Sequence, residues 1–135
     1  MDGASYLIPL SVRLPPALIL TMESPAHRID LEAYLSRIGH DGGRDPGLAT
    51  LAAVHSAHAR TIPFENLDIL LGRRIATDLA AVERKLVHDR RGGYCFEQNA
   101  LLGAALRELG FTVTPLIGRV RWQVPDEVET PRVHQ

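Results

Sequence analysis

The chain has 135 residues, 45% of them hydrophobic, a length and composition typical of one globular domain of ordinary size. Its 15 lysine and arginine residues against 16 aspartate and glutamate residues give a net charge of -1 without a basic run, which argues against a nucleic-acid-binding protein. The single cysteine excludes an internal disulfide, so we expect a cytoplasmic protein.

The first twenty residues, MDGASYLIPLSVRLPPALIL, contain apolar clusters without a helical or strand period. Asp2 stands where a secretory signal needs positive charge, and three prolines interrupt the stretch, so we expect neither a signal peptide nor a membrane span. We interpret residues 1–27 as a leader that is disordered or that precedes a true start at Met22.

Two short helices are predicted next. In residues 29–39, IDLEAYLSRIG, apolar residues recur at helical spacing between Asp30, an expected N-cap, and Gly39, which marks the end. After a turn-rich segment, residues 45–46 (Asp-Pro) predict the start of a second helix that runs through Arg60. The expected apolar stripe of this helix is Leu48, Leu51, Val54, His55 and His58.

Two further helices follow a break at Pro63 in TIPFENLDILLG. Thr77 or Asp78 is expected to cap the third helix, which ends before the two arginines at 90 and 91. Its apolar face is Leu79, Val82, Leu86 and Val87. The fourth helix is predicted over residues 96–109, with Gly110 as its end. Its apolar positions are Ala100, Leu101, Ala104, Ala105 and Leu109.

Beyond Gly110 the hydrophobic period changes to two, which predicts one β-strand over residues 112–122. The residues expected on one face of it are Leu116, Gly118, Val120 and Trp122. A polar loop, VPDEVETPR, follows. A lone strand cannot satisfy its own backbone, so we expect its partner strands outside these 135 residues.

The only cysteine, Cys95, lies in RRGGYCFEQN, residues 90–99, at the start of the predicted fourth helix. Thiolate is the nucleophilic form of cysteine, and a helix N-terminus favours it. Gly92 and Gly93 allow positive φ angles and the close approach of a ligand. Cys95 is therefore either a small buried residue at a helix start or a nucleophile, and the flanking glycines and arginines weaken the first interpretation.

A nucleophilic cysteine needs a base, so each histidine is a candidate. His55 and His58, three residues apart on one helix, are typical of structural histidines. A zinc site made of this pair and Cys95 is disfavoured, because one cysteine and no second cluster are present, and we expect no metal. His27, His40 and His88 are interpreted as solvated. By spacing alone His134 is a tail histidine.

Three segments, in this order along the chain, resemble the arylamine N-acetyltransferase family. They are HSAHARTIPFENLDILLG (55–72), RKLVHDRRGGYCFEQNALLGAALRELGF (84–111) and TPRVH (130–134). The resemblance implies a helical first domain, a β-barrel second domain and an α/β lid, with Cys95 opening the helix that joins the first two. It also implies that Cys95 takes the acetyl group from acetyl-CoA and that His134 is its base.

The predicted fold class is α+β, a helical bundle leading into an incomplete β-barrel, with cysteine and histidine arranged as in cysteine proteases. After the leader, residues 28–110 form the helical domain that carries the nucleophile, and residues 111–135 begin the barrel domain. The family's chain continues into further barrel strands and an aspartate that orients the imidazole. The sequence is therefore interpreted as a truncated N-terminal half, with impaired or no activity by itself.

The resemblance implies supporting residues for the cysteine. Glu65 and Arg91 are expected to form an ion pair that braces the loop of Gly92 and Gly93, although two unrelated surface charges would look the same in the sequence. Phe64 is expected to form a wall of the acceptor pocket, where an aryl group stacks, or to be a plain core aromatic.

The implied reaction is the ping-pong transfer of acetyl from acetyl-CoA, through a thioester on cysteine, to an arylamine or arylhydrazine. No bound cofactor is implied, and neither a nucleic acid nor a membrane is expected as a partner. Two alternatives stay open: an amide synthase or other acyl-CoA transferase on the same scaffold, and a truncated pseudoenzyme that binds a ligand or partner without turnover. The sequence does not identify the acceptor or the oligomeric state.

Overall fold

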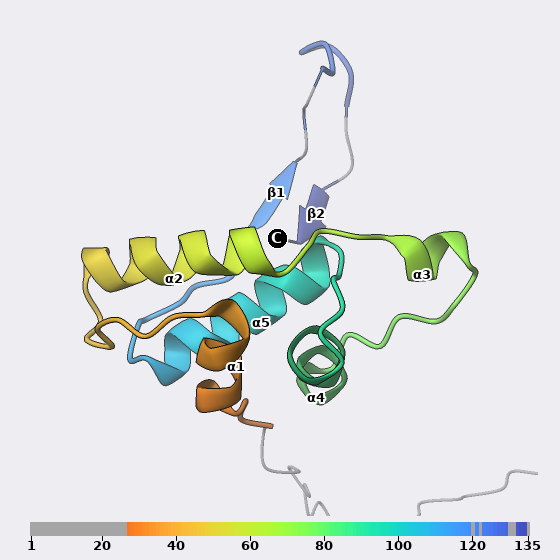
Figure 1. The fold of residues 1–135 in the computed structure, drawn as a ribbon. Coiled ribbons are helices and arrows are strands. Elements are labelled where there is room, and N and C mark those ends of the chain that lie inside the picture. The colour runs from red at the N-terminus through yellow and green to blue at the C-terminus, as the bar shows by residue number, and fades with distance from the viewer. Residues whose placement is uncertain (1–26, 120, 122, 130–131, 135) are drawn as a thin grey trace, which may run out of the picture.

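The computed structural model describes residues 27–119, 121, 123–129 and 132–134 of the chain. Within them the helical elements are α1 (Leu31–Ile38), α2 (Leu48–Thr61), α3 (Leu67–Leu70), α4 (Leu79–Glu83), the π-helical turn η1 (Arg84–His88) and α5 (Cys95–Glu108). The strands are β1 (Ile117–Arg119) and β2 (Arg132–His134). Figure 1 shows α1, α2, α4 and α5 grouped together, with α3 to the right of this group and the two strands beside it. The leader, except for its last residue, lies outside the described residues, as do Val120 and Trp122.

The first helix has the caps that its sequence predicts. The Asp30 side chain accepts a hydrogen bond from the backbone N–H of Ala33 (3.0 Å), and Gly39 adopts a left-handed conformation with φ 69°. A Cβ would be strained at this φ, so glycine suits the position. Tyr34, Leu35 and Ile38 are buried, and the predicted first helix is confirmed.

The second helix begins two residues later than the Asp-Pro start that the sequence predicts, with Gly47 as its N-cap. The predicted apolar stripe is wrong at two positions, since Leu48 is 82% exposed and His55 is exposed. The buried residues of α2 are Thr50, Val54, Ala57 and His58. Their spacing of four, three and one rotates the buried face away from Leu48 and His55, so that small and polar residues fill part of the interface.

The third predicted helix is present in two parts. Asp78 caps α4 by accepting from the N–H of Ala81 (2.9 Å), and the helix then widens into the π-helical turn η1. Val82, Leu86 and Val87 are buried as expected, whereas Leu79 is half-buried. The pattern of apolar residues did not predict the π turn, and the short helix α3 lies in a segment interpreted only as a break.

Helix α5 contacts α1, α2 and α4. It begins at Cys95, one residue before the predicted start, and Gly110 follows it with φ 89°. Leu101, Ala104, Ala105 and Leu109 are buried and Ala100 is half-buried. Ala104 and Ala105 are small, which allows the neighbouring helices to approach α5 closely. The buried apolar residues of α1, α2, α4 and α5 belong to one core cluster.

The strand region differs from its prediction. Among the described residues of the predicted strand, Ile117–Arg119 form β1, and its partner is β2 of the same chain, in an antiparallel pair with Ile117 opposite His134 and Arg119 opposite Arg132. The expectation that the chain contains no partner strand is therefore wrong, because residues placed in a polar tail return to pair with β1. The incomplete β-barrel stays a prediction.

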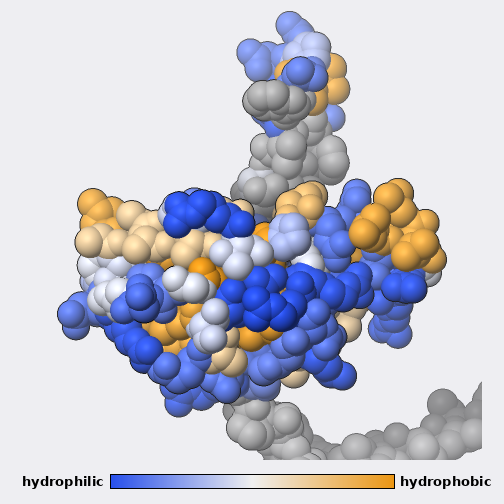
Figure 2. Space-filling view, viewed as in Figure 1, coloured by the Kyte–Doolittle hydropathy of each residue, from blue (hydrophilic) through white to orange (hydrophobic). Residues whose placement is uncertain are grey.

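Hydrophobic side chains also gather on the outside of the molecule around α3. In Figure 2 they form the orange area at the right-hand end. Leu67 is 52%, Leu70 73% and Leu71 63% exposed. No helix in the described part of the chain is both long and apolar enough to cross a membrane.

Candidate active site around Cys95

The thiol of Cys95 is free and half-buried, on the first residue of α5. Tyr94 precedes it in an extended conformation (φ -89°, ψ -178°), so the chain turns sharply from an extended loop into a helix at the cysteine. The first backbone N–H groups of a helix have no partner within the helix. They therefore give the surroundings of Cys95 a partial positive charge.

The loop before Cys95 is held against the segment after α2. Phe64 and Gly93 form a parallel bridge, in which Glu65 N–H donates to Gly93 O (3.0 Å) and Gly93 N–H donates to Pro63 O (3.2 Å). A Cβ on Gly92 would overlap the Pro63 carbonyl oxygen and lie 2.9 Å from Glu65 Cγ. The glycines therefore permit the close approach of another backbone segment.

This finding corrects the expected reason for the two glycines. Among the described residues, the positive φ angles at glycine are at Gly39, Gly72 and Gly110, and not at Gly92 or Gly93. The residue of this loop with positive φ is Arg90 (φ 54°). The glycines give steric room to the segment 63–65 and to a side chain of α5, which the sequence pattern alone does not show.

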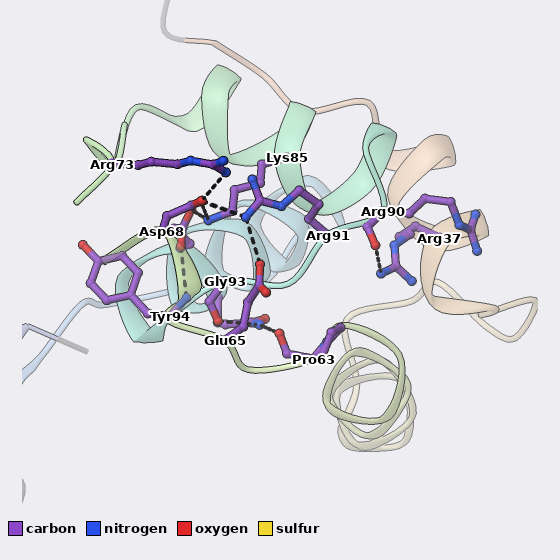
Figure 3. A network of polar contacts seen from close by, with 12 residues as sticks. Arg37, Pro63, Glu65, Asp68, Arg73, Lys85, Arg90, Arg91, Gly93 and Tyr94 are labelled. Carbon is purple, nitrogen blue, oxygen red and sulfur yellow. Dashed lines mark hydrogen bonds and ion pairs between the residues drawn. The ribbon is translucent and has the colours of Figure 1, made fainter. Parts of the chain in front are cut away.

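Buried Arg37 supports this loop from α1. Its Nε donates to Leu86 O (2.9 Å), and its two terminal nitrogens donate to Thr61 O (3.3 Å) and Arg90 O (3.4 Å). Figure 3 shows the contact between Arg37 and Arg90. Burial lowers the pKa of Arg37. The buried guanidinium thus links α1 and the end of α2 to the turn that leads to the cysteine.

Arg91 lies in a network of charges on the other side of the loop (Figure 3). Its Nη2 is 3.2 Å from Glu65 Oε1 and 2.9 Å from both carboxylate oxygens of Asp68. Lys85 Nζ is 2.9 Å from Asp68 Oδ2, and Arg73 is 3.4 Å from Asp68 Oδ1. The predicted contact between Glu65 and Arg91 is therefore present, but it is not bidentate, and Asp68 is the centre of the network.

Glu97 extends this network into α5. Its side chain is 1% exposed, with Oε1 2.8 Å from Lys85 Nζ. Its Oε2 accepts from the backbone N–H of Tyr94 (3.0 Å), the N-cap residue. A carboxylate at this third helical position satisfies a donor at the helix start. A Cβ on Gly93 would lie 2.8 Å from the same Oε2, so Gly93 also leaves room for Glu97.

The network shifts the pKa values of Asp68 and Lys85. Hydrogen bonds from Arg91 and Lys85 hold the pKa of Asp68 well below its usual range. Burial lowers the pKa of Lys85, but hydrogen bonds to Glu97 and Asp68 outweigh burial and raise it. Lys85 is therefore a fixed positive charge at neutral pH, between carboxylates of α3 and α5.

A second, uncharged chain of hydrogen bonds reaches the cysteine loop through α2. His58 is 5% exposed, with Nδ1 3.0 Å from the Tyr34 hydroxyl and Nε2 2.8 Å from Gln98 Oε1. Gln98 Nε2 donates to Pro63 O (2.9 Å) and Gly93 O (3.1 Å). Burial lowers the pKa of His58 and raises that of Tyr34. His58 is thus a structural histidine, as its position predicts.

Phe64 lies beside a hollow of about 240 Å³ next to α5. The side chain is 69% exposed, so it is not a core aromatic. Gln98, Asn99 and Leu102 of α5 line the same hollow. Positions three, four and seven residues after Cys95 share its face of the helix, so the hollow lies along that face. The full lining is His55, His58, Ala59, Ile62, Phe64, Gln98, Asn99 and Leu102.

The remaining histidines contribute no described contact to Cys95. His27 is exposed, as its interpretation as a solvated residue requires, and its Nε2 also lies 2.6 Å from Glu83 Oε2. His40 Nε2 lies 3.1 Å from Gly43 O, and His55 and His88 are exposed. In the described residues no three His, Cys, Asp or Glu side chains are grouped to hold a metal ion. The backbone of His134 lies in β2, and its pairing with the Cys95 thiol stays a prediction.

Sequence reasoning missed four members of the charge network, Asp68, Glu97, Lys85 and Arg73. Asp68 lies three residues after Glu65 in PFENLD, a spacing that indicates one face of a helical turn. Glu97 lies three residues after Tyr94, the capping-box spacing, although tyrosine is not a usual N-cap. Apart from being the only lysine in the sequence, Lys85 showed no feature that indicated a role at the site. Its direction depends on the π-helical turn η1, which the pattern of apolar residues does not predict.

Comparison with known proteins finds relatives in the same family that the sequence resembles. A family model described as N-acetyltransferase matches residues 47–135. The arylamine N-acetyltransferase of Mycolicibacterium smegmatis is 55% identical over 105 residues, covering 76% of this chain and 38% of that protein. The arylamine N-acetyltransferase of Escherichia coli (strain K12) is 50% identical over 105 residues, covering 78% of this chain and 37% of that protein.

Solved structures agree with these relatives. The arylamine N-acetyltransferase of M. tuberculosis matches with a TM-score of 0.72 and 47% identity, covering 76% of this chain and 38% of that one. That of Mycobacterium marinum in complex with CoA matches with a TM-score of 0.71 and 48% identity, over the same shares. The chain thus spans less than two fifths of the length of these relatives.

Proposed function

Because the chain belongs to the arylamine N-acetyltransferase family, we propose that it carries the nucleophile of an acetyl transfer from acetyl-CoA to an arylamine or arylhydrazine. The observation that carries this proposal is the free, half-buried thiol of Cys95 at the first turn of α5. The M. marinum relative in complex with CoA supports acetyl-CoA as the donor.

In the proposed first half-reaction, the Cys95 thiolate attacks the carbonyl carbon of acetyl-CoA. The bond between that carbon and the CoA sulfur breaks, and the His134 imidazolium donates its proton to the departing CoA thiolate. Backbone N–H groups at the start of α5 stabilise the oxyanion that forms between these events. The product is an acetyl thioester on Cys95.

In the second half-reaction, the nitrogen of the acceptor amine attacks the thioester carbonyl and loses a proton to neutral His134. The carbon–sulfur bond breaks, which regenerates the Cys95 thiolate beside the imidazolium. We propose that the aryl group of the acceptor binds in the hollow lined by Phe64. The exposed phenyl ring of Phe64 is available to stack against this aryl group, and the hollow lies along the face of α5 that carries Cys95. No metal or bound cofactor takes part in these steps.

Glu65, Arg91, Gly92 and Gly93 are proposed to support the site without contacting substrate. The bridge of Gly93 to the segment 63–65 and the contacts of Arg91 fix the extended loop from which Cys95 enters α5. Removing the Glu65 or Arg91 charge should loosen this loop. The coupling between them should be below about 1 kcal/mol, because the pair is partly exposed and Asp68 also holds Arg91.

We further propose that residues 28–110 form the family's helical domain and that residues 111–135 begin its barrel domain. The single cysteine suits the reducing cytoplasm that we propose as the location. A polypeptide of residues 1–135 produced alone should turn over slowly, because an imidazole without an orienting acid loses on the order of 10^4 in rate in other triads.

The test is thioester formation. The chain is mixed with acetyl-CoA, quenched in acid and measured by intact-mass spectrometry, with Cys95→Ser as the matched variant. A single acetyl adduct that hydroxylamine removes, absent from Cys95→Ser, is expected. A polypeptide extended along the length of the relatives should form the adduct faster and pass it to an arylamine. An equal adduct on Cys95→Ser, or none in the extended polypeptide, would refute the proposal.

A further inference from the structure

Two opposite charges, the Glu97 carboxylate and the Lys85 ammonium, meet at the first turn of α5, the turn that begins at Cys95. Glu97 lies two residues after the cysteine, in the first turn of the same helix, and its side chain is 1% exposed. Its carboxylate places a full negative charge at the helix end whose first backbone N–H groups carry a partial positive charge. Lys85, whose side chain is 16% exposed, meets the same carboxylate at 2.8 Å.

The geometry points to Lys85 and Glu97 as a positioning pair for the proposed nucleophile: Glu97 holds the backbone that presents Cys95, and Lys85 cancels the negative charge that this requires. The inference rests on the proposed function of Cys95. It assigns neither residue a contact with substrate, and it adds Lys85 and Glu97 to the residues that support the site.

The hydrogen bond from Tyr94 N–H to Glu97 explains why a carboxylate is present. Tyr94 is the residue before Cys95, so this bond of 3.0 Å fixes the peptide that leads directly into the cysteine. Gly93 makes room for the carboxylate, because a Cβ there would lie 2.8 Å from Glu97 Oε2 and 3.0 Å from its Cβ. Glycine at position 93 therefore leaves room for the Glu97 side chain and also permits the backbone bridge to Phe64.

Lys85 is held where it can neutralise that carboxylate. It projects from η1, and its ammonium is fixed between Glu97 Oε1 and Asp68 Oδ2 at 2.8 and 2.9 Å. The remaining charges of the network lie further away: Arg91 and Arg73 contact Asp68, and Glu65 contacts Arg91. Lys85 is thus the cation that contacts Glu97 in the described structure.

The Tyr94 hydroxyl lies at the same N-cap and responds to both charges. Burial raises the pKa of this hydroxyl, Glu97 raises it further, and Lys85 lowers it. The carboxylate and the ammonium therefore act on the Tyr94 hydroxyl with opposite sign.

The experiment measures alkylation of Cys95 by iodoacetamide in the 135-residue chain at pH 7 and over a pH series. Glu97→Gln keeps an oxygen that accepts from Tyr94 N–H and removes the negative charge, so alkylation at pH 7 should become roughly three- to tenfold faster. Lys85→Met leaves Glu97 uncompensated, so alkylation should become slower by a similar factor and its pH midpoint should rise.

The double variant Lys85→Met with Glu97→Gln should return to a rate near that of the wild type, because both charges are absent and Asp68 keeps Arg91 and Arg73. Glu108→Gln is the matched control, since it removes a carboxylate from the other end of α5, where Glu108 contacts Arg28. Its alkylation rate should equal that of the wild type. Circular dichroism checks the fold of each variant.

A purely structural role predicts changes of the same sign in both single variants. Changes of the same sign, or an unchanged rate in Glu97→Gln, would overturn the inference. If Lys85→Met does not fold, Glu97→Gln and the double variant still decide, since the inference requires the first to be faster and the second near wild type. A wild-type thiol that reacts no faster than a cysteine peptide would instead count against the proposed function itself.

Discussion

The helices around α5 and the hairpin of β1 and β2 carry the two catalytic residues of the proposed site, and they are stabilised by different interactions. The helices bury a shared core, in which Tyr34, Val54, Leu86 and Leu101 are each 0% exposed. The hairpin is a pair of three-residue strands, and Gly118 in it meets nothing within 4 Å of an added Cβ. Cys95 therefore sits on an element fixed by packing, whereas His134 sits on one defined by backbone pairing.

The difference should be largest for a core substitution. Leu101→Ala removes a fully buried side chain from the middle of α5, so the free energy of unfolding should fall by about 2–5 kcal/mol. Urea denaturation followed by circular dichroism measures this loss. Leu102→Ala, at a half-buried position of the same helix, is the control and should cost clearly less. Equal losses would mean that α5 is not held by its buried face.

The next largest effect is expected where the cysteine loop meets the segment after α2. Gly92→Ala places a methyl group against Pro63 O and Glu65 Cγ, and such overpacking costs about 1–3 kcal/mol. Because the bridge between Phe64 and Gly93 must shift, the alkylation rate of Cys95 should change as well. Gly103→Ala on α5 has only contacts of 3.5 Å or more and serves as the control. An unchanged alkylation rate in Gly92→Ala would show that the conformation of the cysteine loop does not affect the reactivity of the Cys95 thiol.

A moderate effect is expected from pH, through His58. Burial lowers the pKa of His58 in the folded chain, so the unfolded state binds its proton first as the pH falls. The stability from neutral His58 is present above about pH 6.5 and is lost as the pH falls through the lowered folded pKa, with a slope of at most about 1.4 kcal/mol per pH unit.

The check is urea denaturation of the wild type and of His58→Gln between pH 7.5 and pH 5. The wild type should lose more free energy of unfolding than the variant over this range. The contribution of Asp68, whose pKa is also lowered, appears only in more acid solution. Parallel curves for the two proteins would show that His58 does not titrate differently on folding.

The smallest effect is expected in the hairpin. Gly118→Ala adds a methyl group to an exposed position with open space around it, and the free energy of unfolding should change by no more than about 0.5 kcal/mol. Thermal and urea denaturation both measure this. A loss as large as that of Gly92→Ala would mean that the hairpin is packed as tightly as the helices, and the contrast between the two regions would fail.

The sequence predicted the helical region well where local signals exist. The caps Asp30 and Asp78 and the stop at Gly39 are set by residues within one turn, and the structure confirms them. The stripe of α2 was predicted with errors because Leu48 and His55 have the right spacing but the core lies on the neighbouring face. Which face a helix buries depends on its tertiary partners and not on its own period.

Nonlocal features were not predictable in the same way. The pairing of β1 with residues 132–134 joins two segments that are separated by a polar loop, and no local sequence pattern predicts this pairing. At the site, the contact of Glu65 with Arg91 followed from the family resemblance, whereas Asp68, Lys85 and Glu97 come together only once α3, η1 and α5 are packed. Charges far apart in the sequence become a network through the fold.

The position of Lys85 also bears on self-acylation. A cysteine thioester acylates primary amines, and the sequence offers a single lysine side chain as an internal target. That amine is held by Glu97 and Asp68, and although burial lowers its pKa, these hydrogen bonds raise it above its ordinary value. A protonated amine has no lone pair with which to attack a carbonyl carbon. The hydrogen bonds to Glu97 and Asp68 therefore disfavour acylation of Lys85 by the acyl group that Cys95 is proposed to carry.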